Sequence, residues 1–127
     1  PNVRLPAKAA LFEGRAFFLG NRHEILTEFP AIRAALPHLD INSIVALPLK
    51  VQGDSFASVV FYLEEINTFS GDLQQFFESL ASQASVALDR AFLFEKQEQQ
   101  KQELQDALRS RDEFFSIASH ELKTPLT

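Results

Sequence analysis

The chain has 127 residues, of which 46% are hydrophobic, and it carries a formal net charge of −5 at pH 7. This size predicts one modest globular core plus an extension, and the lack of a basic cluster excludes a nucleic-acid or anionic-membrane partner. No cysteine is present, which excludes disulfides, thiolate metal sites and cysteine-linked chromophores and fits the reducing cytoplasm. No apolar stretch approaches the ~20 residues that a membrane-spanning helix needs.

The chain begins with Pro1 and contains no methionine, so we expect it to be a segment of a longer cytoplasmic protein. Short apolar runs separated by Gly, Pro, Asn and Asp are typical of a mixed α and β domain and continue to about residue 92. The first elements expected are a helix over residues 5–12, a strand over residues 16–19 and a short helix over residues 28–36, which Pro37 ends.

An antiparallel hairpin is expected next, from residues 44–49 and 56–63. Both runs are rich in β-branched and aromatic side chains, and Gly53 between them provides a turn residue. Pro48 has no N–H to donate, so it favours an edge or bulged position in the first of the two strands.

A strong helical pattern starts at Ser70, which is a good helix-capping residue. Apolar residues then recur at three- and four-residue steps along one predicted sheet-facing side: Leu73, Phe76, Phe77, Leu80, Ala84, Ala87, Leu88 and Ala91. Neither glycine nor proline interrupts the chain from Asp72 until Pro125, so the helix is expected to continue through the C-terminal half. A helix of that length needs a partner helix, and we predict a parallel coiled coil.

Residues 95–103 contain no apolar side chain and are predicted to form a solvated helix, because Gln, Glu and Lys favour helices. Downstream residues at alternating four- and three-residue spacing form a heptad seam: Leu104, Leu108, Arg111, Phe115, Ala118 and Leu122. With Phe115 at an a position, His120 takes the outermost f position. The histidine is therefore expected to face water while the seam residues are buried.

The surroundings of His120 suit an imidazole that accepts a phosphoryl group. Glu121 is adjacent and is a candidate to hold the proton of the second ring nitrogen. Thr124 is one turn further along, where its hydroxyl would reach the modified ring or position a water molecule. Pro125 removes a backbone hydrogen bond and softens the helix beside the reactive group.

The three histidines also allow other interpretations. A second His-Glu-x-x-Thr sequence at His23 lacks the apolar seam and the proline, and indicates a surface loop or a helix start. A zinc site of the His-Glu-x-x-His kind fails at His120, because Thr124 occupies the second ligand position and no cysteine exists. His38 follows Pro37 in a predicted loop, where a structural or solvated role is expected and haem ligation stays open.

The C-terminal segment resembles the phosphoacceptor box of sensor histidine kinases, at the start of their dimerisation and histidine-phosphotransfer domain. The resemblance lies in Phe114-Phe115-Ser116-Ile117-Ala118-Ser119-His120-Glu121-Leu122-Lys123-Thr124-Pro125-Leu126. It implies that His120 is phosphorylated, that Glu121 is the acid–base partner and that Thr124 serves in dephosphorylation. It also implies ATP and Mg²⁺ in a separate kinase domain and a response-regulator receiver aspartate as the next phosphoryl acceptor.

The upstream part resembles the C-terminal portion of a GAF domain, a ligand-sensing or dimerising module. The resemblance rests on residues 29–30, 43–49, 53–54, the strand ending at 63, Phe69 and residues 80–91. It implies a domain that lacks the opening helix and first strands of a whole GAF domain. Ala57 replaces a frequent glycine, and the Asn-Lys-Phe-Asp-Glu signature of cyclic-nucleotide GAF domains is absent.

The sequence therefore predicts an α+β chain of three parts: a partial GAF-like sensory domain over residues 1–92, a helical signalling linker over 93–110 and the start of a phosphotransfer domain over 111–127. We expect a homodimer through the C-terminal helix and a small-molecule ligand of unidentified chemistry. The chain shows no nucleotide-binding motif, so it is not expected to autophosphorylate alone. Two alternatives remain: a non-catalytic GAF-type ligand-binding and dimerisation module, and a structural coiled-coil adaptor.

Overall fold

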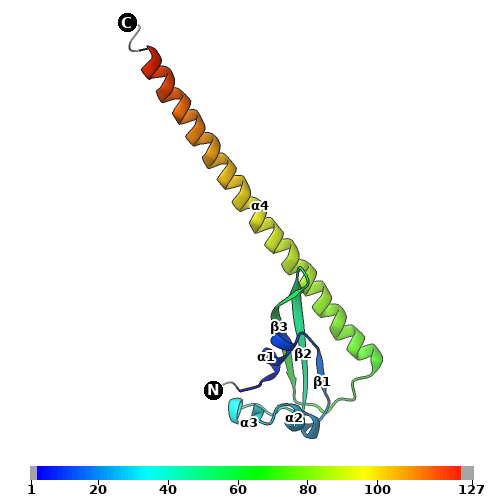
Figure 1. Ribbon diagram of the computed structural model, residues 1–127. Coiled ribbons are helices and arrows are strands. Elements are labelled where there is room, and N and C mark those ends of the chain that lie inside the picture. The colour runs from blue at the N-terminus through cyan, green and yellow to red at the C-terminus, as the bar shows by residue number, and fades with distance from the viewer. Residues whose placement is uncertain (1–2, 124–127) are drawn as a thin grey trace. The chain divides into compact units, whose positions relative to one another are not determined.

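Residues 3–123 are described by the computed structural model, which contains short helices and three strands followed by one long C-terminal helix (Figure 1). The described elements are α1 (Pro6–Glu13), β1 (Phe17–Leu19), α2 (Arg22–Glu28), α3 (Ile32–Ala35), β2 (Ser43–Val51), β3 (Asp54–Leu63) and α4 (Gly71–Lys123). The α+β class is confirmed. The chain forms two compact units, Pro1–Asp89 and Arg90–Thr127. The finer predicted boundaries at residues 92 and 110 stay predictions.

The three strands form an antiparallel sheet in the order β1-β2-β3. The predicted hairpin is confirmed as β2 and β3, and the predicted strand over residues 16–19 is confirmed as β1. Gln52 and Gly53 form the turn with φ of 53° and 86°. Positive φ at both central residues is the requirement of a type I′ hairpin turn, and Gly53 meets it without strain.

Pro48 lies in the central strand of the sheet, but at a point where it has only one neighbouring strand. β1 pairs with β2 only through Ile44, Val45 and Ala46, so it ends before Pro48 is reached. The register of β2 against β3 then shifts between Leu49 and Lys50. The missing N–H of Pro48 is tolerated because this stretch of β2 is locally an edge beside a bulge, which agrees with the prediction.

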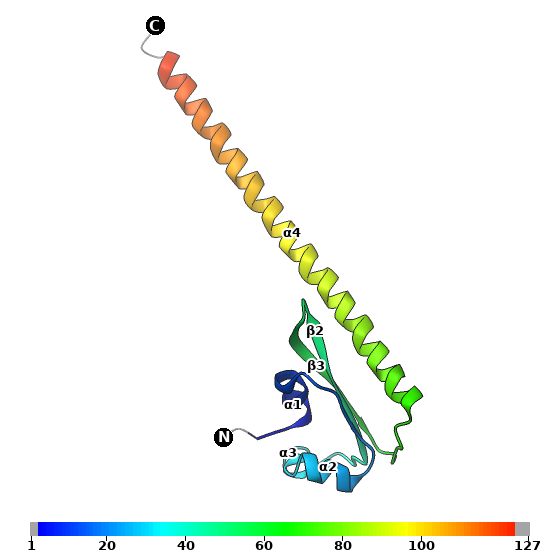
Figure 2. The same cartoon turned by 45° about the vertical axis from the view of Figure 1, so that its right-hand side comes forward.

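The two faces of the sheet carry separate cores. Figure 2 shows α1, α2 and α3 on one face and the first part of α4 on the other. Phe29, Ile44 and Ala46 are buried on the face covered by α1–α3, in contact with small side chains of α1. On the opposite face, Ala81 of α4 packs against Val45 and Leu47, surrounded by partly buried Phe18, Phe61, Phe69 and Phe77. Burial of each large apolar side chain contributes about 1.5–3 kcal/mol.

The start of α4 is fixed by Ser70, as predicted, because its hydroxyl accepts a hydrogen bond of 3.2 Å from the N–H of Leu73. The prediction of one apolar side facing the sheet is wrong in part. Phe77 and Ala81 face the sheet, whereas Phe76 and Leu80 are 56% and 39% exposed. Successive residues of a helix lie about 100° apart, so the apolar residues divide into a buried stripe and a neighbouring exposed stripe.

The helix predicted over residues 28–36 is replaced by a break. α2 ends at Glu28, and α3 begins only at Ile32. Pro30 disfavours helical dihedrals at the residue before it, Phe29, whose φ and ψ are −130° and 75°. The break places the fully buried Phe29 ring in the core, 5.2 Å from the ring of Phe17 in an edge-to-face arrangement.

The connector between β3 and α4, residues 64–70, is held to the sheet by a series of hydrogen bonds. The buried Ser43 hydroxyl donates to the Glu65 carbonyl at 2.7 Å, and the Asn42 amide donates to the Glu64 carbonyl at 2.6 Å. The Asn67 N–H then donates to the Gly20 carbonyl at 2.9 Å, at the end of β1. The connector is thereby joined to both β1 and β2.

Candidate functional site

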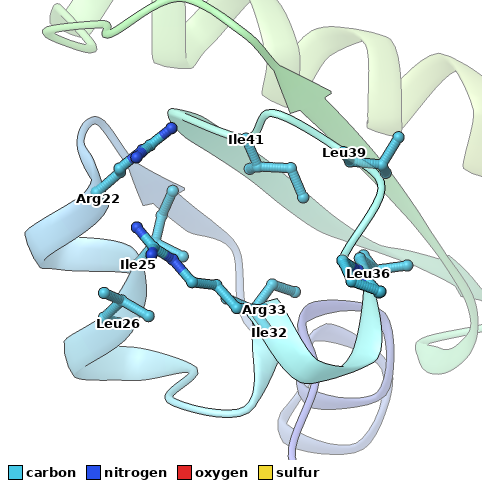
Figure 3. A pocket seen from close by; sticks show the side chains of 9 residues that line it. Arg22, Ile25, Leu26, Ile32, Arg33, Leu36, Leu39 and Ile41 are labelled. Carbon is cyan, nitrogen blue, oxygen red and sulfur yellow. The ribbon is translucent and has the colours of Figure 1, made fainter.

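A pocket of about 290 Å³ lies between α2, α3 and the loop that leads into β2 (Figure 3). Its walls are largely aliphatic, from Ile25, Leu26, Ile32, Leu36, Leu39 and Ile41. None of its lining residues belongs to a strand. The helix break at Phe29 creates this pocket, because it lets α3 turn back beside α2.

Two arginines line this pocket, and they differ in whether an anionic side chain is paired with them. The Arg22 guanidinium donates to the Asp40 carboxylate and to the Asn42 side-chain oxygen, each at 2.7 Å. Figure 3 shows Arg33 reaching from α3 toward Ile25 of α2. Among the interactions of the described residues, Arg33 has neither a hydrogen-bond acceptor nor an ion-pair partner. The pocket therefore combines aliphatic walls with one neutralised and one uncompensated guanidinium.

A second charged cluster, away from this pocket, joins the N-terminal segment to α1 and α2. Arg4 pairs with Glu13 at 2.9 Å and with Glu28 at 3.2 Å, and Arg15 pairs with the same two carboxylates. The Arg4 guanidinium also lies over the rings of Phe17 and Phe29. Its hydrogen bonds to Glu13, reinforced by those of Arg15, lower the pKa of the Glu13 carboxyl. This cluster is structural, because its charges are mutually compensated.

The predicted phosphoacceptor residues lie at the C-terminal end of α4. His120 and Glu121 are both exposed on the last described turns of that helix. The structure places them on adjacent helical residues, and their proposed roles remain untested. Thr124, the third predicted site residue, and Pro125 lie outside the described residues.

The predicted heptad seam is exposed in the single chain. Phe115 and Leu122 are 52% and 72% exposed, and Leu104 and Leu108 are exposed as well. The Arg111 guanidinium, which interrupts the seam, lies 5.3 Å from the centre of the Phe115 ring. Burial of the seam and the coiled coil itself therefore stay predictions that require a second helix.

The seven-residue spacing of this seam can be followed toward the N-terminus of α4. Residues in the same heptad position as Phe115 are Leu73, Leu80, Ala87, Phe94, Lys101, Leu108 and Leu122. All of them lie on α4, which has no break between Gly71 and Lys123. The residue at this position changes from apolar to charged at Lys101, within the polar residues 95–103.

The other two histidines occupy ordinary surface positions. His23 is exposed on the first turn of α2, so the second His-Glu-x-x-Thr sequence is a helix start, one of its two predicted readings. Thr27 of that sequence donates its hydroxyl to the His23 carbonyl at 2.7 Å. His38 is exposed between α3 and β2. Across residues 3–123, no group of three or more His, Cys, Asp or Glu residues is arranged to hold a metal ion.

A three-stranded antiparallel sheet with helices on both faces, followed by a long helix, defines a small α+β domain. The GAF domain family matches residues 2–89, and the chain belongs to that family. This confirms the GAF part of the sequence interpretation. The search of curated proteins gives no match to this chain. Of the helices described here, none combines the length and the hydropathy needed to cross a lipid bilayer.

Proposed function

We propose that this chain is the sensory and phosphoacceptor part of a two-component sensor histidine kinase. The observation that carries the proposal is the position of His120: an exposed histidine beside Glu121, on a helix that starts within the GAF domain. The surrounding sequence, from Phe114 to Leu126, resembles the phosphoacceptor box of that family. We place the reaction in the cytoplasm, where ATP is available.

In the proposed reaction, a ring nitrogen of neutral His120 attacks the γ-phosphorus of ATP. A nitrogen–phosphorus bond forms, the bond from phosphorus to the β–γ bridging oxygen breaks, and ADP leaves. Glu121 accepts the proton of the second ring nitrogen and so stabilises the positive charge that develops on the imidazole. A receiver aspartate of a response regulator then attacks the same phosphorus, and the nitrogen–phosphorus bond breaks to return His120.

ATP and its Mg²⁺ would be supplied by a separate kinase domain, with the metal neutralising charge on the transferred phosphoryl group. The four glycines of the chain, Gly14, Gly20, Gly53 and Gly71, do not have the spacing of a glycine-rich phosphate-binding loop. The chain by itself is therefore expected to accept a phosphoryl group without catalysing its transfer.

Dimerisation through α4 belongs to the same proposal. The exposed heptad residues of α4 would be buried against a second copy of the helix, with Leu108 and Phe115 in the seam and His120 at an outer f position. This arrangement keeps the imidazole accessible to a kinase domain while the helix pair holds it in a fixed orientation. The exposure of these apolar side chains in the single chain supports the proposal.

The test supplies a histidine-kinase catalytic domain in trans with γ-labelled ATP. We expect an acid-labile label on the chain that is lost in His120→Gln. The matched control is His23→Gln, which removes the histidine of the other His-Glu-x-x-Thr sequence and should leave the label unchanged. A label that persists in His120→Gln, or one that is stable to acid, would contradict the proposal. Absence of label with several catalytic domains would favour a non-catalytic binding and dimerisation module.

A further inference from the structure

The pocket between α2 and α3 has features of a binding site for a small organic anion. Its volume of about 290 Å³ is close to the lower end of the range of ~300–1,000 Å³ that small-molecule sites occupy. At ~30 Å³ for a water-sized group, this volume accommodates about ten non-hydrogen atoms. The occupant is therefore much smaller than a nucleotide.

The walls of the pocket determine the body of the ligand. Ile25 and Ile32 are buried at its base, Leu26, Leu36 and Ile41 are partly buried, and Leu39 is 51% exposed at its mouth. These side chains contribute no hydrogen-bonding groups. A hydrocarbon chain or a ring gains free energy by covering them, whereas a polar body would lose its hydration without replacement.

The charges at the rim determine the head group. Arg22 is neutralised by Asp40, which lies 2.7 Å from its guanidinium. Arg33 has no anionic partner among the described residues, which leaves one net positive charge from these three groups. A guanidinium binds a carboxylate through two parallel hydrogen bonds, so one uncompensated arginine matches one monoanionic carboxylate.

We propose that this pocket binds a small monocarboxylate with an apolar body, of the size of a medium-chain fatty acid. The aliphatic chain lies against Ile25, Leu36 and Ile41, and the carboxylate pairs with Arg33. The inference rests on the sensory role of the GAF domain in the proposed function, and it names the chemical class of the signal. Binding would join α2, α3 and the loop into β2 through one ligand.

Octanoate, which has ten non-hydrogen atoms, is the probe. The full chain is titrated with octanoate, and the chemical shifts of its backbone amides are recorded by NMR. We expect saturable shifts at one site, concentrated in residues 22–41. The neutral analogue 1-octanol should bind at least about tenfold more weakly, because it makes no charge-assisted bond with Arg33. Equal binding of the two probes, or shifts that lie elsewhere, would overturn the proposal.

Variants of Arg33 provide a second test of the proposed binding site. Arg33→Gln should weaken octanoate binding about tenfold and bring it to the level of 1-octanol, while Arg33→Lys should retain part of the affinity. The matched control is Arg109→Gln, an exposed arginine on α4. Arg33 is exposed, so both variants are expected to fold, and equal melting temperatures would verify this. Unchanged octanoate affinity in Arg33→Gln would contradict the assignment.

A titration with octyl phosphate distinguishes a site for carboxylates from a site for phosphates. One uncompensated arginine predicts that it binds no more tightly than octanoate. Preference for octyl phosphate by tenfold or more would overturn the monocarboxylate assignment in favour of a phosphorylated ligand. These measurements need neither ATP nor His120. Failure of octanoate binding therefore leaves the phosphoacceptor proposal intact, and failure of His120 labelling leaves the binding result intact.

Discussion

The Asp89 carboxylate on α4 accepts a hydrogen bond of 3.0 Å from the backbone N–H of Gln52, at the tip of the β2–β3 hairpin. One turn earlier on the helix, the Ser85 hydroxyl accepts a hydrogen bond of 3.0 Å from the N–H of Lys50. Gln52 has a φ of 53°, a left-handed conformation that a residue with a Cβ disfavours. The helix therefore stabilises the bulged, strained end of the hairpin.

Removing the Asp89 carboxylate should weaken the folded domain. Asp89→Ala leaves the Gln52 N–H without this acceptor, and we expect the free energy of unfolding to fall by about 1–2 kcal/mol. Asp89→Asn keeps an acceptor oxygen and should cost less. Urea unfolding followed by circular dichroism measures both. Glu78→Ala, an exposed carboxylate on the same helix, is the control, and an equal effect of Glu78→Ala and Asp89→Ala would contradict this account.

The turn itself offers a stabilising substitution. Gln52→Asn produces an Asn-Gly pair, which is the preferred sequence for a type I′ turn, and the bond to Asp89 is kept because it uses the backbone N–H. We expect the free energy of unfolding to rise by about 0.5–1 kcal/mol. Gly53→Ala should have the opposite sign, since φ at that residue is 86°. Thermal melts compare the two variants, and a lower melting temperature for Gln52→Asn would show that the turn is of another kind.

Gly20 is required by the close approach of the connector after β3. A Cβ at this residue would overlap the backbone oxygen of Asn67, which cannot move aside as a flexible side chain can. Gly20→Ala should therefore lower the free energy of unfolding by about 1–3 kcal/mol or more. Gly71→Ala is the matched control, because a Cβ there meets no atom within 4 Å. Comparable melting temperatures for the two variants would rule out the steric explanation.

Acid should weaken the N-terminal charged cluster. Hydrogen bonds from Arg4 and Arg15 hold the pKa of Glu13 below its ordinary value of 4.5. In that range the folded chain binds fewer protons than the unfolded chain, so this contribution is present above pH 4.5 and is lost as the pH falls through the lowered pKa. Arg4→Gln should flatten the acid side of the stability profile slightly, because exposed pairs contribute little. An unchanged profile would show that the pair does not affect stability.

The unbroken helix α4 leads to a prediction about signalling in the proposed sensor kinase. Inserting one residue between 95 and 103 rotates the downstream seam by about 100° relative to the GAF domain, while inserting seven residues restores its phase. We expect the first insertion to change the rate of His120 phosphorylation and the second to preserve ligand control. Equal activity of both insertions would exclude transmission through helix register.

The elements predicted correctly are those whose pattern is local. The hairpin follows from two β-branched runs around Gly53, and α4 follows from Ser70 and an uninterrupted helical sequence. The start of α2 was predicted only as one of two interpretations of the sequence at His23, although Asn21 and Glu24 provide a further signal. The Asn21 side chain accepts from the Glu24 N–H at 2.9 Å, and Glu24 accepts from the Gly20 N–H at 2.7 Å. This is close to the reciprocal pattern of a capping box.

The pocket could not be predicted from the sequence, because its walls come from three separate segments. Arg22, Arg33 and Ile41 become neighbours only when the chain breaks at Phe29 and turns back. The sequence contains one usable signal, since Pro30 predicts the break. Which arginine remains uncompensated depends on the position of Asp40, and that is a property of the folded loop. The phosphoacceptor segment, in contrast, could be proposed from the sequence, because its residues are contiguous.

The hydrogen-bonded connector of residues 64–70 has a mechanical consequence. Its hydrogen bonds to Gly20 and Ser43 hold the segment between β3 and the first turn of α4 against the sheet. We therefore expect a displacement of the loop entering β2, such as a ligand in the pocket would cause, to be transmitted through these hydrogen bonds to the start of α4. Lengthening the connector with glycines would leave α4 coupled to the strands by the packing of Ala81 and by the hydrogen bonds of Ser85 and Asp89 to the hairpin.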